Sequence, residues 1–294
     1  MAKILITGGS GQVGSRLVER LSEITVLNDN IYLLKRTRNI TNVDPIVKGR
    51  VTIIDDVNLY NYDLAFHLAA NTDTKSSKEL GCKNKYINDN VKLTEKVVNR
   101  SGRVLFVSTD NVFRGDSKDS YKESDKTNPC NFYGITKAMA EEIVLNNKGA
   151  VIRIQTIIGT KSNLIVNRVF EAIDGKEYWP FWNDTFTRPA FFEDFFTIAK
   201  RVYESGENGV YHISTIGNPI SRADLAYKVL DIHKKHNLPI KRDTFNTESC
   251  SDPQFPRRLV LNTKQTEEEL EYKFTSLDEA LEKHVLYARG LNKI

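Results

Sequence analysis

The chain has 294 residues, of which 40% are hydrophobic and 27% charged, and its formal net charge is +4. These values are ordinary for a globular protein with a sizeable core, and the charge is too small and dispersed to indicate nucleic-acid binding. The three cysteines lie far apart without a C-x-x-C pair, which predicts neither a disulfide framework nor a metal site and fits a reducing compartment. Met1-Ala2-Lys3 leads directly into an apolar run without a signal-peptide layout, and no apolar run approaches the roughly 18 residues of a membrane span. We therefore expect a cytoplasmic protein.

Short apolar runs alternate with helix-like stretches over the first 160 residues. Most of these runs lack period-two alternation, which is typical of strands buried on both faces. Strand–helix–strand alternation predicts an α/β protein with a doubly wound parallel sheet of the Rossmann type. The predicted strands are Lys3–Thr7, Ile31–Lys35, Val51–Ile54, Asp63–Leu68, Arg103–Ser108 and Ala150–Ile154, and the predicted helices are Gln12–Leu21, Asn84–Asn99 and Phe132–Leu145.

The pattern changes after residue 160, where aromatic residues and irregular stretches become frequent. We predict a first domain over residues 1–160 and a smaller substrate lobe over residues 161–294. A further predicted strand, Val210–Ser214, could return to the main sheet. The predicted helices of this lobe are Asn163–Ile173, Arg222–His236, Thr266–Leu270 and Leu277–Tyr287.

Glycines follow the first predicted strand in the pattern G-x-x-G-x-x-G, at positions 8, 11 and 14. Gly8 permits a tight turn, Gly11 lets the backbone approach a pyrophosphate, and Gly14 lets the helix pack closely against the strand. The helix N-terminus adds N–H groups and the positive end of its dipole. This turn predicts a dinucleotide site, with Gln12 and Val13 at the cofactor.

The second predicted strand ends at a pair of basic residues, Lys35 and Arg36. In an NAD site, an acidic residue about 20 positions after the glycines typically holds the ribose 2′-hydroxyl. Cations at this place would instead pair with a 2′-phosphate, and Arg36 is the best single candidate. We therefore expect NADP(H) rather than NAD(H), which favours net reduction.

Tyr133 and Lys137 form a Y-x-x-x-K pattern at the start of a predicted helix, where they share one face. A neighbouring ammonium favours the phenolate, so we expect Lys137 to lower the pKa of Tyr133. Thr109 lies 24 residues earlier, at the end of a predicted strand. A hydroxyl at that end lies over the nucleotide crevice, where it could hydrogen-bond a substrate carbonyl. The constellation predicts an oxidoreductase.

Together these elements resemble the extended short-chain dehydrogenase/reductases and, within them, the dTDP-4-dehydrorhamnose reductase family. The likeness covers most of the chain. It is carried by three runs, Ser108-Thr109-Asp110-Asn111-Val112-Phe113, Tyr121-Lys122-Glu123-Ser124-Asp125 and Asn131-Phe132-Tyr133-Gly134-Ile135-Thr136-Lys137.

The resemblance implies that Thr109, Tyr133 and Lys137 form a catalytic triad, in which Lys137 also contacts the nicotinamide ribose. It also implies further cofactor contacts in the first domain. These come from Asp56, Val57, Leu68, Ala69, Ala70 and Asn90.

The sequence departs from the family pattern on the substrate side. Family dehydratases carry an Asp-Glu pair after the threonine, whereas Asp110 is followed here by Asn111, so we do not expect dehydration. Thr156 replaces a tryptophan expected near the sugar, and Phe255-Pro256 stands where Arg-Pro is usual. These changes leave the sugar open. The candidate substrate residues are Asp110, Asn111, Thr156, Arg188, Arg257 and Arg258.

The resulting hypothesis is NADPH-dependent reduction of a 4-keto group on a nucleotide-linked deoxysugar. Two alternatives remain open. One is a nucleotide-sugar epimerase, which the basic pair Lys35-Arg36 disfavours; the other is a non-catalytic NADP-binding regulatory subunit resembling that of methionine adenosyltransferase, which the changes at Thr156 and Phe255 keep open. The expected partner is a nucleotide-diphosphate sugar, with no nucleic acid, membrane or metal, and the chain is a candidate homodimer.

Overall fold

The computed structural model describes residues 1–25, 28–35, 38–72, 82–116, 119–160, 164–252 and 255–291. The chain forms two compact units, each discontinuous in sequence. Unit 1 comprises Met1–Phe113, Lys126–Arg153 and Phe196–Tyr211, and unit 2 comprises Arg114–Asp125, Ile154–Phe195 and His212–Ile294. Among the described residues, no helix combines the length and the apolar character that a membrane crossing requires.

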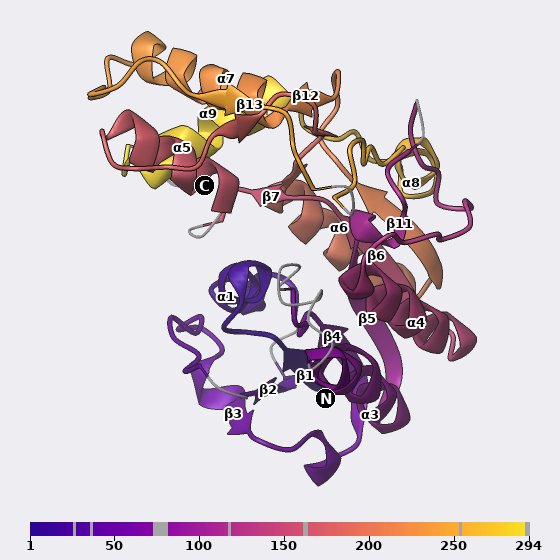
Figure 1. The fold of residues 1–294 in the computed structure, drawn as a ribbon. Helices are drawn as coiled ribbons and strands as arrows, with labels where there is room; N and C mark the ends of the chain where they lie inside the picture. The colour runs from indigo at the N-terminus through magenta and orange to yellow at the C-terminus, as the bar shows by residue number, and fades with distance from the viewer. Residues whose placement is uncertain are drawn as a thin grey trace. The chain divides into compact units, whose positions relative to one another are not determined.

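A seven-stranded sheet with the order β11-β6-β5-β4-β1-β2-β3 forms the centre of unit 1 (Figure 1). The pairs within β1 to β5 are parallel. The strand order reverses between β1 and β4, the kind of switch point at which open α/β sheets bind ligands. The predicted Rossmann-type α/β fold is therefore confirmed. The strands are β1 (Lys3–Thr7), β2 (Asn30–Leu34), β3 (Val51–Ile54), β4 (Tyr62–His67), β5 (Ser101–Thr109), β6 (Ala150–Ile154) and β11 (Gly209–Ile213).

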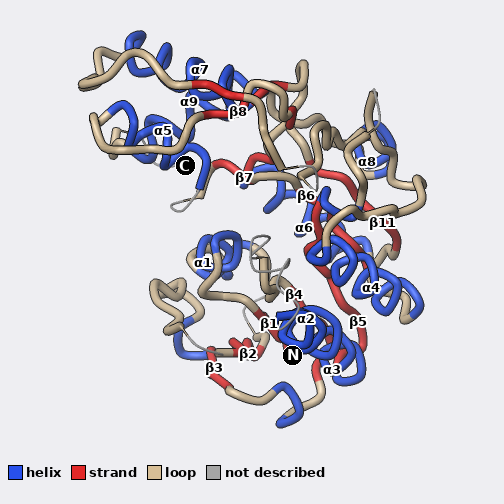
Figure 2. The backbone as a smooth tube through the Cα atoms, in the orientation of Figure 1, coloured by secondary structure: helices blue, strands red, loops and turns tan. Residues whose placement is uncertain are grey.

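Helices cover the sheet of unit 1 and explain why its central strand β1 is apolar on both faces. Ile4, Leu5 and Ile6 of β1 are fully buried. Figure 2 shows α3 and α4 beside the strands β4 and β5, and α3 also packs against α4. The helical elements of unit 1 are α1 (Gln12–Val18), η1 (Leu21–Glu23), η2 (Lys48–Arg50), η3 (Val57–Leu59), α2 (Lys83–Tyr86), η6 (Ile87–Lys92), α3 (Leu93–Arg100), η7 (Asp110–Val112), α4 (Phe132–Asn146) and most of α6 (Phe192–Ser205).

The stretch predicted as one helix over residues 84–99 is interrupted. Its middle, η6, is a π-helical turn between the α-helical segments α2 and α3. A π turn holds one extra residue and occurs frequently at functional sites. The extent of the helix was predicted, but its change of winding was not.

Unit 2 packs three helices around an apolar core. Val169 of α5, Ala226 of α7 and Leu281 of α9 are fully buried in one cluster. The described residues of this unit also form three two-stranded sheets. The elements are β7 (Ile157–Ile158), α5 (Leu164–Ile173), β8 (Phe181–Trp182), β9 (Phe186–Thr187), β10 (Ala190–Phe191), β12 (Ile220–Ser221), α7 (Arg222–Lys235), β13 (Thr247–Glu248), α8 (Lys264–Glu269) and α9 (Leu277–Ala288).

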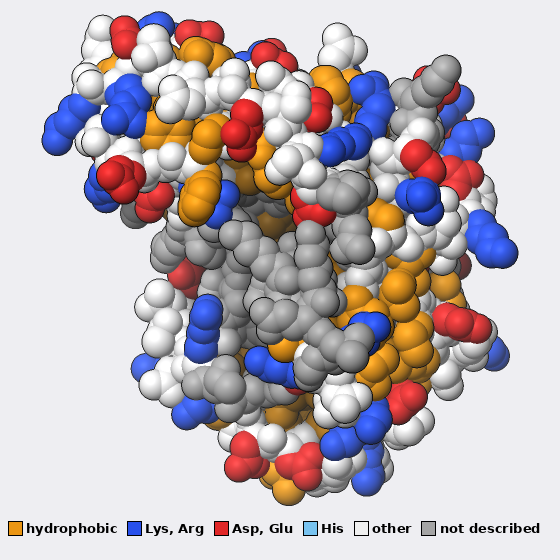
Figure 3. Space-filling model, in the orientation of Figure 1, with side chains coloured by type: hydrophobic (Ala, Val, Ile, Leu, Met, Phe, Trp, Pro, Cys, Tyr) orange, Lys and Arg blue, Asp and Glu red, His pale blue; other side chains and the backbone are white. Residues whose placement is uncertain are grey.

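The helix α4 has one buried face and one exposed apolar face. Tyr133 and Lys137 are buried, whereas Ile135 and Met139 are exposed. Figure 3 shows hydrophobic side chains gathered over α4. The spacing of four residues therefore places the two candidate catalytic side chains on the inner face, as the sequence predicted.

A buried ion pair joins α4 to β6. The Arg153 guanidinium donates to both carboxylate oxygens of Glu141, with Nη2 2.8 Å from Oε2 and Nε 3.0 Å from Oε1. Both side chains are almost fully buried, and the Arg153 guanidinium also lies over the Phe113 ring. Each charge is therefore stabilised mainly by the other, because water does not reach them.

Substitution of Arg153→Met should destabilise the protein by about 3–5 kcal/mol, because it leaves the Glu141 carboxylate buried without its partner. Urea denaturation measures the change. The double variant Arg153→Met/Glu141→Met should recover most of the loss. Glu204→Gln, which removes an exposed pair with Lys200, should change stability by less than about 1 kcal/mol. A loss in Arg153→Met no larger than that of Glu204→Gln would contradict this account.

Candidate active site

The parallel registers bring the candidate cofactor segments to one edge of unit 1. Thr7 pairs with Leu34 and with His67, and Leu34 pairs with Ile54. Each of these four residues is the last of its strand, so the chain leaves the sheet at the same edge in each case. The candidates that follow are Gly8, Gly11, Gln12, Val13, Gly14, Lys35, Asp56, Val57, Leu68, Ala69 and Ala70.

The glycine turn after β1 is built by close backbone approaches. Gly8 has φ +73°, and the Gly11 N–H donates to its carbonyl oxygen at 2.9 Å. A Cβ on Gly14 would lie 2.1 Å from the same oxygen, and a Cβ on Gly8 would lie 2.6 Å from the Ala69 nitrogen. Among the described residues, no side chain caps the N-terminus of α1. This turn fits a pyrophosphate, because its tight backbone brings the helix N-terminus to the ligand edge.

The basic and acidic candidates at the neighbouring strand ends differ in their surroundings. Lys35 is exposed, and its backbone N–H donates to the Ile54 carbonyl at 2.8 Å. Arg36 lies outside the described residues. The Asp56 carboxylate accepts from the backbone and side-chain N–H groups of Asn58, both at 3.0 Å, and so caps the turn η3. Lys35 is therefore a described, exposed cation at this edge that is available to a 2′-phosphate.

The start of α4 is fixed against the turn after β5. The Asn131 side chain caps the helix by accepting from the Gly134 N–H at 2.8 Å, and its amide donates to Asn111 Oδ1 at 3.0 Å. A Cβ on Gly134 would lie 2.0 Å from the Asn111 carbonyl oxygen. Only glycine permits this approach, and it brings the residue before it, Tyr133, close to Thr109.

The Thr109 hydroxyl lies between Tyr133 and two polar neighbours. It donates to Asp110 Oδ1 at 3.0 Å and accepts from the Asn111 backbone N–H at 3.2 Å. The Asn111 amide also donates to Asp110 Oδ1, at 2.9 Å. A glutamate at position 111 could not donate in this way, so the departure from the dehydratase pattern has a structural role.

Burial dominates the protonation of Tyr133. Desolvation raises the pKa of its phenol well above the ordinary value, although the hydrogen bond with Thr109 acts in the opposite direction. The sequence led us to expect a lowered pKa, and that expectation was wrong, because desolvation outweighs the effects that lower it. The phenol is held in its protonated form.

Lys137 is 2% exposed and lies against β5. Its ammonium donates to the Val107 carbonyl at 2.7 Å and lies 3.7 Å from the centroid of the Phe106 ring. Burial lowers the pKa of Lys137 to about 7, against the opposing effect of the Glu141 carboxylate. A small change in its surroundings therefore changes its charge near neutral pH.

Asn90 bridges two parts of unit 1 from within the π turn. Its Oδ1 accepts from the Asn71 N–H at 2.7 Å, and its Nδ2 donates to the Asn71 carbonyl at 3.2 Å. The same amide donates to Thr136 Oγ at 2.9 Å. Asn90 thus connects the segment after β4 with α4, and its side chain is occupied by protein groups.

The candidate substrate arginines all belong to unit 2, on segments that lie side by side. Phe186 bridges to Arg258, and its N–H donates to the Arg257 carbonyl at 2.7 Å. The Arg188 N–H donates to Gln155 Oε1 at 2.8 Å, and burial lowers the pKa of its guanidinium. Within the described part of the chain, the buried Nε atoms of Arg188 and Arg258 lack a hydrogen-bond partner. The Thr156 carbonyl accepts from the Ala190 N–H at 2.9 Å, beside the same segment.

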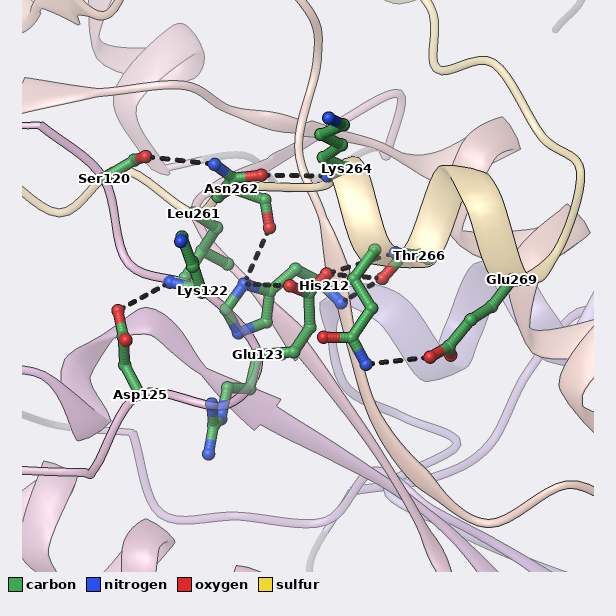
Figure 4. A network of polar contacts seen from close by, with 12 residues as sticks. Ser120, Lys122, Glu123, Asp125, His212, Leu261, Asn262, Lys264, Thr266 and Glu269 are labelled. Carbon is green, nitrogen blue, oxygen red and sulfur yellow. Dashed lines mark hydrogen bonds and ion pairs between the residues drawn. The ribbon is translucent and has the colours of Figure 1, made fainter.

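The run Tyr121–Asp125, which carries part of the family resemblance, has a structural role in unit 2, shown in Figure 4. The buried Glu123 carboxylate accepts from the Thr266 hydroxyl at 2.8 Å and from its N–H at 3.3 Å. His212 donates from Nδ1 to the Asn262 carbonyl at 3.0 Å. These contacts tie the run to the start of α8.

Three residues that support the site were not singled out from the sequence, namely Asn131, Gly134 and Thr136. Each lies inside the motif that contains Tyr133 and Lys137. An asparagine three residues before a helical glycine is a possible N-cap signal. The contact that requires Gly134, with Asn111, joins distant parts of the sequence and could not be read from spacing.

Lys137 should make the stability of the cofactor-free protein depend on pH. Its pKa of about 7 in the folded protein lies below the ordinary value of 10.5, so the unfolded chain binds more protons between these pH values. The free energy of unfolding should therefore rise with pH over this window. The measurement is urea denaturation of wild type and Lys137→Met from pH 7 to 10, since the difference isolates this group. A pH-independent difference would contradict the prediction.

The chain matches the family model described as RmlD substrate binding domain over residues 2–288. It is 28% identical over 247 residues to dTDP-4-dehydrorhamnose reductase of Aggregatibacter actinomycetemcomitans, an alignment that covers 79% of each protein.

Two solved structures have the same fold. One is dTDP-4-dehydrorhamnose reductase of Bacillus anthracis in complex with NADP, with a TM-score of 0.76, 22% identity and coverage of 98% of this chain and 99% of that one. The other is the dTDP-glucose 4,6-dehydratase DesIV of Streptomyces venezuelae with NAD and TYD bound, with a TM-score of 0.82, 22% identity and coverage of 98% and 97%. A reductase and a dehydratase match similarly, so the fold does not decide the reaction. Because the family model spans nearly the whole chain, the protein belongs to the RmlD substrate binding domain family, as the resemblance of its motifs led us to expect.

Proposed function

We propose that this protein is an NADPH-dependent oxidoreductase that reduces the 4-keto group of a nucleotide-linked deoxysugar. The observation that carries the proposal is the buried group of Thr109, Tyr133 and Lys137 in unit 1. It lies at the strand edge that also carries the glycine turn. The printed names of the relatives, dTDP-4-dehydrorhamnose reductases, supply the substrate class.

The protonation state of the site suits reduction. NADPH, held by Gly8, Gly11 and Gly14 of the glycine turn, would supply the hydride for the carbonyl carbon. Tyr133 acts as the general acid and gives its proton to the carbonyl oxygen. The Thr109 hydroxyl, turned from Asp110 Oδ1 toward the substrate, orients that oxygen by a hydrogen bond. Because burial raises the pKa of Tyr133, the phenol is protonated before the reaction begins. Lys137 stabilises the phenolate that remains, since an ammonium nearby favours that form.

The cofactor candidates divide between two tasks. Gly8, Gly11 and Gly14 hold the pyrophosphate, and Lys35 with Arg36 pairs with the 2′-phosphate. Asn90 holds the surrounding backbone. We propose that the boundary between cofactor-binding and substrate-binding residues lies near residue 160. The homodimer and the cytoplasmic location remain predictions from the sequence.

The arginines of unit 2 are proposed to hold the diphosphate of the substrate. Arg188 and Arg258 each have a buried Nε without a hydrogen-bond partner among the described residues. An anion would satisfy these donors, because a guanidinium pairs well with phosphate oxygens. Arg257 shares the segment with Arg258.

The local chemistry disfavours dehydration and a purely regulatory role. Asn111 donates its amide to Asp110 and so occupies the place of the second acid. A regulatory subunit has no need of a buried lysine, and burying that amine lowers its pKa to about 7. If this protein were purified with NAD already bound and acted as an epimerase, that result would contradict the proposal directly.

Substitution of Tyr133→Phe should lower kcat by about 10²- to 10⁴-fold and leave NADPH binding nearly unchanged, because only the transferable proton is removed. The measurement is loss of nicotinamide absorbance with a panel of nucleotide 4-keto-6-deoxysugars. Tyr62→Phe is the matched control, since Tyr62 is buried and its hydroxyl lacks a hydrogen-bond partner among the described residues. Wild-type protein that binds NADPH but turns over no ketosugar would refute the proposed reaction.

Substitution of Lys35→Ala should weaken NADPH binding by about tenfold and leave NADH binding unchanged, because a charge-assisted contact with the 2′-phosphate is worth roughly 1.5 kcal/mol. Fluorescence titration of both cofactors gives the ratio. Lys48→Ala removes another exposed lysine of unit 1 and should leave the ratio as in wild type. An equal loss for NADPH and NADH would show that Lys35 does not contact that phosphate.

A further inference from the structure

Polar side chains occupy the core of unit 1 where the central strands end. Thr7 of β1 pairs with His67 of β4, and His67 pairs with Phe106 of β5. Side chains at paired positions point to the same face of a sheet. Thr7 and His67 are fully buried. Buried polar groups need hydrogen-bond partners, so the partners of Thr7 and His67 determine which of their atoms donate and which accept.

The hydrogen bonds around His67 have one consistent direction. The Ala69 N–H donates to Thr7 Oγ at 3.1 Å, which leaves the Thr7 hydroxyl to donate to His67 Nδ1 at 2.6 Å. The Thr94 hydroxyl donates to the Asn90 carbonyl at 2.6 Å, so its oxygen accepts from His67 Nε2, 2.9 Å away. This pattern requires a neutral imidazole with its proton on Nε2.

The environment of His67 keeps the imidazole neutral. Burial lowers its pKa to about 3, and the Lys137 ammonium acts in the same direction. The Phe106 ring lies beside both groups, with its centroid 5.3 Å from the centroid of the imidazole and 3.7 Å from Lys137 Nζ. His67 therefore keeps one donor and one acceptor over the working pH range.

The chain of contacts continues from Asn90 to the catalytic helix. Asn90 Nδ2 donates to Thr136 Oγ at 2.9 Å, and the Thr136 hydroxyl donates to the Tyr133 carbonyl at 2.9 Å. Thr94 and Thr136 are fully buried. A continuous path thus runs from Thr7, at the glycine turn, to the backbone of Tyr133.

We propose that His67 is a positioning residue that couples the cofactor edge to the catalytic phenol. Through Thr94, Asn90 and Thr136 it holds the first turn of α4 at a fixed spacing from the glycine turn. The effect on turnover rests on the proposed role of Tyr133 as the acid. A misplacement of about 1 Å in such a group can lower a rate roughly 100-fold, so the spacing matters for the reaction.

The central test removes one hydroxyl of the path while keeping its shape. Thr94→Val should lower kcat by about tenfold or more. His67 Nε2 loses the oxygen that accepts its hydrogen bond, and the Asn90 carbonyl loses the hydroxyl that donates to it. Thr94→Ser keeps the hydroxyl and should stay near wild type. Thr25→Val is the matched control, because the buried Thr25 hydroxyl donates to a carbonyl four residues earlier, Leu21, at 2.8 Å. Equal kcat in Thr94→Val and Thr25→Val would overturn the proposal.

A double-mutant cycle separates coupling from general destabilisation. Thr94→Val and Thr136→Val interrupt the same path, so their kcat losses should combine to less than their product. Fully multiplicative losses would mean that the two hydroxyls act independently and would overturn the proposal.

A binding experiment tests the coupling without turnover and without Tyr133 chemistry. Adenosine 2′-phosphate 5′-diphosphate carries the pyrophosphate but lacks the nicotinamide riboside. It should slow amide hydrogen exchange of residues 133–137 in wild type and Thr94→Ser, but not in Thr94→Val. Binding without slower exchange in wild type would refute the coupling and leave the proposed reaction intact. If wild-type protein showed the exchange effect but turned over no ketosugar, the proposed reaction would be refuted and the coupling would stand.

Discussion

The site depends on one constraint, the parallel register that ends β1, β2, β3 and β4 at a common edge. Thr7 is the shared point of that register, because it pairs with Leu34 on one side and His67 on the other. The glycine turn can then follow β1 with almost no free space, as the contacts of Gly8 and Gly14 demonstrate. A slip of one residue in β1 would exchange the side chains on its two buried faces and displace the turn at once. Core packing and the geometry of the glycine turn are therefore set by the same hydrogen bonds.

Burial is the second organising influence, and it acts in opposite directions on the two titratable groups of the site. Desolvation disfavours charge, so it raises the pKa of Tyr133 and lowers that of Lys137. Tyr133 is consequently held neutral, whereas Lys137 changes its charge near neutral pH. The carboxylate of Glu141, itself held by Arg153, favours the charged form of Lys137 from the next turn of α4. The ion pair that anchors the helix thereby also influences the pKa of Lys137.

Much of the cofactor half could be predicted from local patterns. Apolar runs predicted β1, β3 and β6 with their observed bounds. β1 and β6 are almost entirely buried, whereas β3 is a partly exposed edge strand. The spacing of Tyr133 and Lys137 predicted their shared face, because residues four apart lie on one side of a helix. The π turn was missed, since one extra residue barely alters an apolar pattern. The sign of the Tyr133 pKa shift was also missed, because desolvation depends on residues far away in sequence. Contacts such as Glu123 with Thr266 and His67 with Thr94 join distant segments and leave no local pattern.

The π turn η6 has a consequence for how this region can change over evolutionary time. In an ordinary helix, inserting one residue rotates every later side chain by about 100° and disrupts its packing. Here the extra residue is already accommodated between two α-helical segments. Tyr86, before the turn, packs against Phe132, whereas Val97, after it, belongs to the core under the sheet. The π turn thus fixes the packing phase of the second half relative to the first, and both halves contact α4. A deletion that removed the extra residue would rotate one half by about 100° against the other and displace Asn90 from the turn.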